Sequence, residues 1–350
     1  MVMSAREVEV VRRVLRRTME SEFPHFPRWV WGDSIPLEGV LAAGAALGEA
    51  EAVAWVQDLI VRWAQSVDRL EAGDFLAPGV PLLLVYERTG DRRLLDVARQ
   101  LAAVFTGARH GRRGVPLYYP RGHQWQWGAP VDVMQLVGPF LALLGRLTGE
   151  RDYATQAMVH LLGLSAALFD PCEGLFEHWH FDDRGSTTRG FWGRGQGWAL
   201  LGLADALRYA PPDAPGVAAV QAILVQHAES LARWQHESGH WRTVVDRPDV
   251  YLETSVACFF AAAVPPAIQA GLLPRTLRDA AERAWQAALA RVDEQGNVQG
   301  TSAGTAGGDV WHYARIPVGA YKWGQGPFLL AAARRLSEHG GRQAGAAPRV

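Results

Sequence analysis

The chain contains the segment Tyr86-Glu87-Arg88-Thr89-Gly90-Asp91 between two stretches whose apolar residues recur at helical spacing. A matching segment, Gly145-Arg146-Leu147-Thr148-Gly149-Glu150, stands between two further stretches of the same kind. In each segment the glycine favours the end of one helix, and the acidic residue favours the start of the next. Because connections this short join antiparallel neighbours, each segment predicts a helical hairpin.

Helical spacing of apolar residues continues along nearly the whole chain, whereas strand-like alternation is scarce. The spacing predicts about twelve helices, roughly over residues 5–21, 36–47, 49–69, 79–88, 92–105, 131–147, 153–168, 197–209, 217–235, 252–269, 274–292 and 325–338. Helices paired in this way predict an all-α fold, in which six hairpins close into an α/α barrel, a toroid with an inner and an outer ring. We expect one domain over residues 1–339 and a disordered tail over residues 340–350.

Longer stretches without helical spacing interrupt this pattern, at residues 106–130, 170–196, 236–250 and 295–323. They carry most of the loop histidines and many of the 14 tryptophans of the chain. Long loops within a compact domain usually carry function, and aromatic rings beside His, Arg and Gly suit the stacking of sugars. We therefore expect these loops to gather over one mouth of the barrel as a sugar-binding cleft.

The composition argues against several classes of partner. The chain has 350 residues, 49 % hydrophobic and 20 % charged, and its net charge of -1 gives no attraction to nucleic acid or to an anionic membrane. The longest apolar run, near residues 256–264, is too short to span a bilayer, and residues 1–17 lack the apolar core of a secretion signal. We expect a cytoplasmic protein in which Cys172 and Cys258 are free thiols.

The run Phe191-Trp192-Gly193-Arg194-Gly195-Gln196-Gly197-Trp198 combines two indoles, a guanidinium and an amide with three glycines. Glycines let a backbone approach a ligand closely, tryptophan offers a flat apolar face, and arginine offers a planar fork that matches a carboxylate. Such a loop at the start of a helix suits a sugar ring that carries an acid group, such as a uronic acid. The alternative is a glycine-rich helix entry whose tryptophans belong to the core.

Two aspartates stand at expected helix starts: Asp74, and Asp132 shortly after His123, Trp125 and Trp127. Paired carboxylates in a sugar cleft are the usual groups for general acid and base catalysis. The alternative for each is a helix cap, since aspartate is common there. A helix N-terminus favours the ionised carboxylate, whereas a general acid needs its proton; the charge of Asp74 nearby would help Asp132 to keep one.

Other polar residues of the loops could contact a ligand. His178 is expected to form a hydrogen bond with substrate, whereas His180 is nearly as readily an ordinary loop residue. A metal site at these two histidines lacks a convincing third ligand. The hydroxyl-rich stretch at residues 300–305 and Lys322 could together cradle a carboxylate.

Taken together, these segments resemble the unsaturated uronyl hydrolases of glycoside hydrolase families 88 and 105, and most closely the unsaturated rhamnogalacturonyl hydrolase branch. The resemblance extends in order over nearly the whole chain. The matching elements are Trp31-Gly32-Asp33; Asp74 with Ala77-Pro78-Gly79; Asp132 with residues 138–142; Leu175-Phe176 with His178; residues 192–198; residues 235–241; residues 251–255; and residues 324–326 with 328–331. Each element is modest alone, but the ordered set is specific.

The resemblance implies an (α/α)6 barrel and a hydrolase that acts on lyase-generated oligosaccharides ending in a 4,5-unsaturated uronic acid. Such enzymes hydrate the C4=C5 enol ether. By this resemblance, Asp132 protonates C4 and activates the water that adds at C5, and Asp74 orients the ring hydroxyls. The residues implied in substrate binding are Trp31, His123, Trp127, His178, Trp192, Arg194, Gln196, Trp198 and Lys322. The family needs no metal and no organic cofactor, and an exposed outer ring would permit a homodimer.

Several positions depart from the family pattern. Pro130 stands where the family often has tryptophan, so Trp125 or Trp127 would have to supply that face. Gln196 replaces an asparagine, and Phe75 stands where a polar residue is frequent. These departures leave the acid/base aspartate in place and bear on which uronide and which linkage are accepted.

Two other classes of function compete with the hydrolase. A sugar epimerase or isomerase on a similar barrel would need His178 to converge with His312 or His240, with Asp132 remote. A non-catalytic sugar-binding toroid would need both aspartates to be caps. The ordered family elements favour the hydrolase.

Overall fold

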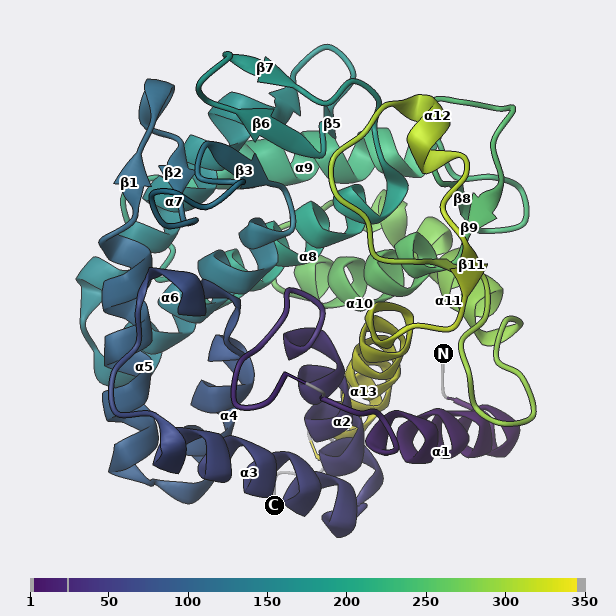
Figure 1. Cartoon of the computed structure of the whole chain (residues 1–350). Coiled ribbons are helices and arrows are strands. Elements are labelled where there is room, and N and C mark those ends of the chain that lie inside the picture. The colour runs from purple at the N-terminus through teal and green to yellow at the C-terminus, as the bar shows by residue number, and fades with distance from the viewer. Residues whose placement is uncertain (1–2, 24, 345–350) are drawn as a thin grey trace.

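Two concentric rings of helices form the framework of the protein (Figure 1). The computed structural model describes residues 3–23 and 25–344. The inner ring comprises α2 (Ser34–Leu47), α4 (Gly79–Thr89), α6 (Val133–Thr148), α8 (Gly193–Tyr209), α10 (Ser255–Gln269) and α13 (Lys322–Ala344). The outer ring comprises α1 (Ala5–Met19), α3 (Ala50–Ser66), α5 (Arg92–Thr106), α7 (Arg151–Leu168), α9 (Val217–Arg233) and α11 (Arg278–Leu289). Successive inner helices pack together, and α13 packs against α2, which closes the ring and confirms the predicted α/α barrel.

The two connecting segments act at the helix ends as predicted. Gly90 ends α4 with a φ of 69°, and Gly149 ends α6 with a φ of 76°, a left-handed conformation that glycine adopts without strain. The Asp91 carboxylate accepts a backbone hydrogen bond in the first turn of α5 at 2.9 Å. Glu150 makes no such cap over the described residues and instead pairs with Arg99 at 2.8 Å, which ties α5 to the start of α7.

The glycine-rich run lies mostly inside α8 rather than in the loop before it, because the helix begins at Gly193 instead of Gly197. These glycines serve close packing: a Cβ added at Gly197 would lie 2.6 Å from the Phe259 ring. In a helix each glycine costs about 1 kcal/mol relative to alanine, and the packing of α8 against α10 offsets that cost. Trp192 and Trp198 are both buried, as the alternative interpretation held.

The last helix is longer than the sequence pattern indicated. α13 starts at Lys322 and continues to Ala344, so residues 340–344 are helical rather than the disordered tail expected from residue 340. The two glycines at residues 340–341 each cost a helix only about 1 kcal/mol, and a formed helix propagates readily. Residues 345–350 lie outside the described part of the chain.

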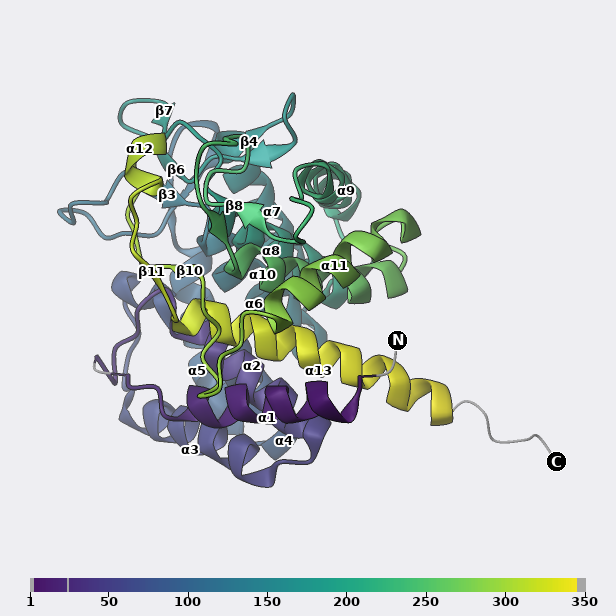
Figure 2. The ribbon, with the colours of Figure 1, turned by 90° about the vertical axis from the view of Figure 1, so that its right-hand side faces the viewer.

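Short strands occur in or beside the stretches that lack helical spacing. They are β1 (Arg109–His110), β2 (Pro116–Leu117), β3 (Gly128–Pro130), β4 (Phe169–Asp170), β5 (Leu175–Phe176), β6 (Trp179–Phe181), β7 (Ser186–Thr187), β8 (Trp241–Arg242), β9 (Leu252–Glu253), β10 (Thr301–Ser302) and β11 (Val318–Gly319). One sheet has the order β3-β6-β7, and the other strands pair two by two. A short helix, α12 (Val310–Tyr313), lies in the last loop. Figure 2 shows β3, β6, β10, β11 and α12 at the end of the barrel where α13 begins, so these loops share one mouth.

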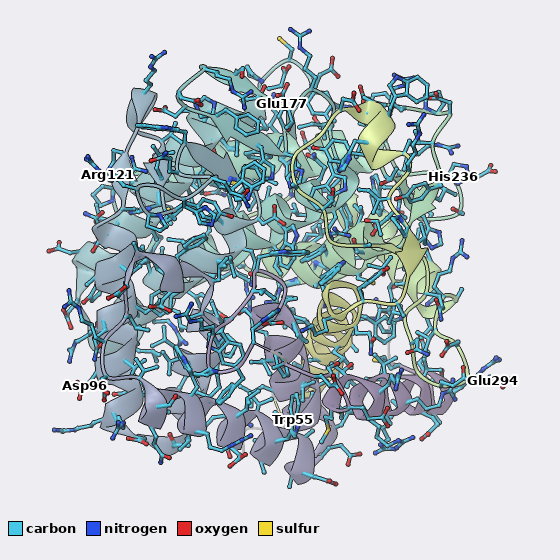
Figure 3. The ribbon with its side chains drawn as sticks, viewed as in Figure 1. Trp55, Asp96, Arg121, Glu177, His236 and Glu294 are labelled. Atoms are coloured by element: carbon cyan, nitrogen blue, oxygen red, sulfur yellow. The ribbon has the colours of Figure 1, made fainter. Side chains whose placement is uncertain are left out.

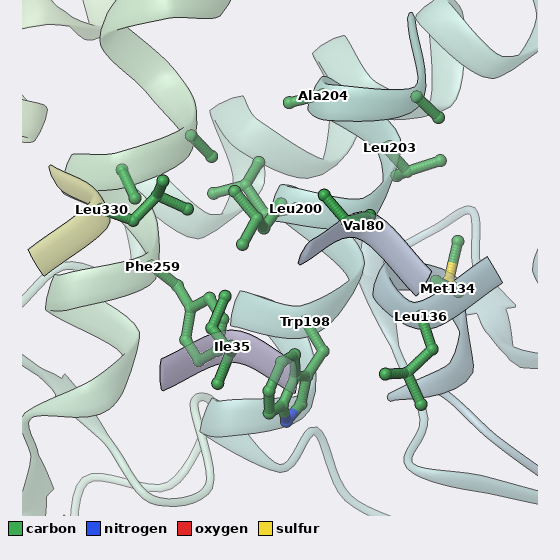
Figure 4. Packing of buried hydrophobic residues seen from close by; sticks show 14 of the residues in the cluster. Ile35, Val80, Met134, Leu136, Trp198, Leu200, Leu203, Ala204, Phe259 and Leu330 are labelled. Atoms are coloured by element: carbon green, nitrogen blue, oxygen red, sulfur yellow. The ribbon is translucent and has the colours of Figure 1, made fainter. Parts of the chain in front are cut away.

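The hydrophobic core lies between the inner helices and extends to the inner faces of the outer ones. Figure 4 shows Trp198 of α8 close to Phe259 of α10 and Ile35 of α2, and the ring centroids of Trp198 and Phe259 are 4.6 Å apart. Charged side chains such as Asp96 and Glu294 lie at the rim, outside both rings (Figure 3). Over the described residues, no helix combines the length and the hydropathy needed to cross a membrane.

Because α8 approaches α6 closely, we expect one methyl group added on α8 to have a large effect on the free energy of unfolding. A Cβ added at Gly202 would lie 2.6 Å from the backbone carbonyl atoms of Met134, which cannot swing aside as a side chain can. We expect Gly202→Ala to lower the free energy of unfolding by about 1–3 kcal/mol in urea denaturation, as overpacked cores do. Gly73→Ala is the control, since a Cβ there meets no described heavy atom within 4 Å. Equal urea midpoints for the two variants would contradict this packing.

A buried polar layer connects four inner helices. Gln135 Nε2 of α6 donates to Glu38 Oε1 of α2 at 3.0 Å, and Arg334 of α13 donates to Asp205 Oδ2 of α8 at 2.5 Å. Burial, followed by the charge of Asp205, raises the pKa of Glu38 to about 8. The Glu38 carboxyl is therefore protonated at neutral pH, and Asp205 carries the charge that pairs with Arg334.

Glu38 gives the stability of the protein a pH dependence of defined sign. Its pKa is about 8 in the folded protein and about 4.3 in an unfolded chain, so the unfolded chain loses this proton first. The contribution of the Glu38 proton to stability is complete below the pKa of the unfolded chain. It is lost as the pH rises through the pKa of the folded protein. We expect Glu38→Gln, which cannot ionise, to resemble wild type at about pH 5 and to exceed its free energy of unfolding at about pH 8, measured in urea. Parallel pH profiles for the two proteins would contradict the raised pKa.

Candidate active site

A small cavity lies at the mouth of the barrel. Its volume is about 40 Å³, which is room for a few water molecules. Its wall is formed by Trp31, Phe75, Leu76, Tyr119, Pro130, Asp132, Val133, Leu136, His178, Trp179 and Thr305. The wall is mostly apolar and aromatic, and it contains one carboxyl group, Asp132, and one imidazole, His178.

Strand pairing brings Asp132 and His178 together. β3 pairs with β6 so that Pro130 stands opposite Trp179, and the Val131 N–H donates to the His178 carbonyl oxygen at 2.9 Å. Because Asp132 follows β3 and His178 precedes β6, their side chains meet, with His178 Nε2 3.4 Å from Asp132 Oδ2. Asp132 stands at the N-terminus of α6, yet its carboxylate caps no N–H of the described helix and remains available in the cavity wall.

His178 is only 2 % exposed and is held from several sides. Its Nδ1 lies 2.9 Å from the hydroxyl of Tyr313, and the indole N–H of Trp179 donates to its Nε2 at 3.1 Å. Its ring lies against Trp192, with the ring centroids 4.1 Å apart. Burial, which is the largest effect, lowers the pKa of His178, so the imidazole is neutral at neutral pH.

Arg194 is fully buried behind the cavity wall. Its guanidinium donates to the carbonyl and hydroxyl oxygens of Ser302 in β10 and, at 2.8 Å, to the carbonyl oxygen of Ala303. Its Nη1 also lies 3.9 Å from Oε1 of Glu253. Burial lowers the pKa of Arg194 to about 10, so it remains a cation at neutral pH. In this arrangement Arg194 joins α8 to β10.

Three indoles surround the Arg194 guanidinium. Its Cζ lies 4.4 Å from the Trp192 ring, 5.4 Å from the Trp323 ring and 5.7 Å from the Trp31 ring. Of these, Trp31 is half-buried and belongs to the cavity wall, whereas Trp192 is buried behind His178. Arg194 itself lies outside the cavity wall, so its contact with substrate stays a prediction.

Glu253 is a site residue whose role the sequence pattern did not reveal. It is fully buried, and its carboxylate accepts from the Ser255 hydroxyl at 2.7 Å and from the Ser302 N–H at 3.0 Å. The pairing with Arg194 arises because the end of β9 lies beside the first turn of α8, and no local pattern shows that contact.

Gln196 and Trp198 are buried outside the cavity wall. Gln196 Nε2 donates to the Phe176 carbonyl oxygen at 2.7 Å, and Gln196 Oε1 accepts from the Phe176 N–H at 2.9 Å. These paired bonds lock α8 to β5. Trp198 packs on Phe259, so both residues support the wall from behind, and their contacts with substrate stay predictions.

Asp74 acts as a cap in this structure. It lies in the 3-10 helix η1 (Ala72–Leu76), where its Oδ2 accepts from the backbone N–H of Glu71 at 2.7 Å. The next two residues along the chain line the cavity, whereas Asp74 stands outside the wall. Its role as the carboxylate partner of Asp132 stays a prediction.

Three other residues expected to bind substrate are not part of the cavity wall. His123 is exposed and stacks on Tyr119, with ring centroids 4.9 Å apart. Trp127 is 41 % exposed, and Lys322 is paired with Asp33 at 2.5 Å. Their contacts with substrate stay predictions for sugars that extend beyond the cavity.

Trp179 supplies the aromatic face beside Pro130. Of the described tryptophans, Trp31 and Trp179 line the cavity, whereas Trp125 and Trp127 do not. Trp125 instead packs against Trp179 from outside, with ring centroids 5.0 Å apart. The sequence places Trp179 directly after the histidine motif, but only the register of β3 against β6 shows that its ring enters the wall.

The remaining polar groups of the wall are the hydroxyls of Tyr119 and Thr305. Burial raises the pKa of Tyr119, so its hydroxyl stays protonated and can donate. Thr305 comes from the hydroxyl-rich stretch that was predicted to cradle a carboxylate. Within the described part of the chain, no group of three or more His, Cys, Asp and Glu side chains could hold a metal ion.

Comparisons with known proteins agree with this fold. Residues 5–338 match the model of Glycosyl Hydrolase Family 88. The chain is 28 % identical over 329 residues to unsaturated rhamnogalacturonyl hydrolase YesR of Bacillus subtilis (strain 168), with 91 % of each chain covered. It superposes with a TM-score of 0.85 on a possible member of the GH105 family from Klebsiella pneumoniae subsp. pneumoniae MGH 78578, at 22 % identity over 97 % of this chain and 95 % of that one. The unsaturated glucuronyl hydrolase of Bacillus sp. GL1 gives a TM-score of 0.71 at 18 % identity over 94 % of each chain.

The barrel and its family match define a glycoside hydrolase. The chain belongs to Glycosyl Hydrolase Family 88, which confirms the resemblance found in the sequence. Family membership favours the hydrolase over the epimerase and over the non-catalytic toroid. An epimerase would also need Asp132 to be remote from His178, whereas Asp132 Oδ2 lies 3.4 Å from His178 Nε2.

Proposed function

We propose that the protein hydrolyses oligosaccharides that end in a 4,5-unsaturated uronic acid, and that unsaturated rhamnogalacturonyl disaccharides are its substrate class. One observation carries the proposal: Asp132, the carboxyl group of an aromatic cavity, faces the neutral imidazole of His178 at 3.4 Å. The family match and the likeness to the Bacillus subtilis hydrolase support this reaction and this substrate class.

In the proposed reaction Asp132 acts first as an acid and then as a base. Protonated Asp132 gives its proton to C4 of the enol ether, and a water molecule adds at C5 and returns a proton to the carboxylate. The product is a hemiketal at C5, which loses its hydroxyl proton and opens to a ketone while the ring oxygen takes up a proton. C1 is then a hemiacetal carbon, which releases the saturated sugar as an alcohol and becomes an aldehyde. One water molecule is consumed, and Asp132 ends as it began.

The mouth of the barrel suits an anionic sugar. α2 and α6 begin within a few residues of the wall residues Trp31 and Asp132, so the positive ends of both helices lie at this end of the barrel. The hydroxyl of Tyr119 can donate to a uronate carboxylate, whereas that of Thr305 donates to the carbonyl oxygen of Ala306. The indoles of the wall offer flat apolar faces to the sugar ring.

Movement of one wall residue would make more room for a sugar ring in this cavity. Trp31 is the half-buried wall residue that covers the guanidinium of Arg194. A shift of the Trp31 indole would enlarge the cavity and uncover a cation for the uronate carboxylate. This movement would give Arg194 and Trp31 the substrate contacts that the family resemblance implies.

The proposal is tested by following the ultraviolet absorbance of the C4=C5 enol ether in a panel of unsaturated disaccharides. The panel contains the 4,5-unsaturated uronic acid linked to rhamnose, to glucose and to a hexosamine, since galacturonic and glucuronic acid differ only at C4 and give the same unsaturated residue. Absorbance should fall fastest with the rhamnose disaccharide. Loss of absorbance with the glucose or hexosamine disaccharide alone would support the reaction and replace the proposed substrate class. A constant absorbance with every member would refute the proposed function.

A further inference from the structure

The hydrogen bonds around His178 carry an inference about how the acid is kept ready for proton transfer. We propose that Trp179 and Tyr313 are positioning residues that fix neutral His178 with its proton on Nδ1, so that Nε2 holds the proton of Asp132 in place. The catalytic consequence rests on the proposed function, whereas the position of the proton on His178 does not.

Trp179 fixes the imidazole from one side. An indole N–H can only donate, and this one points at His178 Nε2 from 3.1 Å, so Nε2 must present its lone pair. A neutral imidazole carries a single proton, which must then be on Nδ1. Burial disfavours a second proton, because it lowers the pKa of His178.

Tyr313 fixes the imidazole from the other side. Its hydroxyl oxygen lies 2.9 Å from His178 Nδ1 and accepts that proton, and it also accepts from the Gly308 N–H at 3.0 Å. With both bonds accepted, the phenol O–H is free to turn towards the hydroxyl of Thr188, which interacts with the same phenol. Tyr313 is fully buried and comes from α12, so the last loop reaches back to orient His178.

This tautomer determines the form of Asp132 that the site accepts. Asp132 Oδ2 lies 3.4 Å from Nε2, whose lone pair also accepts from the Trp179 indole, so a carboxylate would face that lone pair, whereas a protonated carboxyl would share it with the indole N–H. His178 therefore favours the acid form of Asp132 at a helix N-terminus that alone would favour the ionised form. A neighbouring carboxylate such as Asp74 is not needed for this purpose.

Other titratable groups act on the same pair from neighbouring elements. Those that face His178, Asp132 or Tyr313 are Tyr119, Glu177, Arg194 and His312. Arg194 and His312 both disfavour a charged His178. Arg194 also attracts the ionised form of Asp132, so the bond to His178 acts against that attraction.

Nitrogen NMR of protein labelled with ¹⁵N-histidine tests the tautomer directly, because protonated and unprotonated imidazole nitrogens resonate far apart. The signals of His178 among the 11 histidines are assigned by their loss in His178→Gln. At neutral pH we expect Nδ1 to be protonated and Nε2 unprotonated. A protonated Nε2, alone or together with Nδ1, would overturn the proposal. The measurement needs no substrate, so it decides the tautomer even if the proposed function fails.

Tyr313→Phe tests the positioning role. Loss of one hydrogen bond should move the alkaline limb of the kcat profile to lower pH by about 0.5–1 unit, because the acid form of Asp132 is then held less firmly. KM should stay unchanged, since Tyr313 lies outside the cavity wall. The matched control is Tyr118→Phe, which also removes a buried tyrosine–histidine bond, to His160 Nδ1 at 2.5 Å.

The positioning role of Tyr313 would be overturned if the alkaline limb of the kcat profile did not move in Tyr313→Phe. It would also be overturned if that limb moved equally in Tyr118→Phe. Urea midpoints of both variants separate a loss of folding from a change in chemistry. If Tyr313→Phe does not fold, or if wild type acts on no disaccharide, the NMR titration of His178 in wild type decides the proposal. In that titration, Nε2 of His178 must remain unprotonated over the pH range in which the Asp132 carboxyl loses its proton.

Discussion

Asp132→Asn should lower kcat for loss of the enol ether by about 10²- to 10⁴-fold, which is the range that general acid and base groups contribute. The amide keeps the shape of the side chain at the start of α6 but has no proton to give to C4. Asp132 caps no N–H of the described helix, so the variant should keep the urea midpoint of wild type. Initial rates of absorbance loss at saturating disaccharide measure the effect.

Asp182→Asn is the matched control for this experiment. Asp182 is also buried beside a histidine, with His180 Nε2 3.6 Å from its Oδ1. The Asp182 carboxylate accepts from the Arg112 N–H at 2.7 Å and lies outside the cavity wall. The kcat of the Asp182→Asn variant should therefore remain close to that of wild type. Equal losses in both variants, or full activity of Asp132→Asn, would show that the proton comes from elsewhere.

The rings of helices were predictable because their signals act over short distances. Apolar periodicity and the terminating glycines Gly90 and Gly149 need only neighbouring residues, and both glycines adopt the left-handed conformation. The start of α8 was not predictable in the same way. Three glycines in its first turns oppose a helix locally, and only contacts such as that of Gly197 with Phe259 show why one forms.

The site was predictable only in part, because its side chains meet through contacts between remote segments. Motifs identified Asp132 and His178, but the pairing of β3 with β6 is what brings them within 3.4 Å. Tyr313 gave no signal, since its contact with His178 depends on the path of the last loop. Arg194 was expected to face a ligand because its planar guanidinium matches a carboxylate. Its actual partner Glu253 lies far along the chain.

Arg194→Met should lower the free energy of unfolding by about 3–5 kcal/mol, because it leaves Glu253 as an unpaired buried charge. The variant also loses the hydrogen bonds to Ser302 and Ala303 that hold β10 against α8. Adding Glu253→Gln should restore part of the loss, because the unpaired charge is then removed as well. Urea denaturation at neutral pH measures each variant and the coupling between them.

Arg99→Met is the control, since it removes an arginine from an ion pair with Glu150 at 2.8 Å in which both side chains are nearly half exposed. Exposed pairs of this kind contribute little, so its urea midpoint should stay near that of wild type. If Arg194→Met is as stable as Arg99→Met while KM for the disaccharide rises, Arg194 belongs to the substrate-binding surface and Trp31 must uncover it. If stability falls and the folded variant keeps its KM, Arg194 supports the fold by holding β10 against α8 and does not bind the substrate.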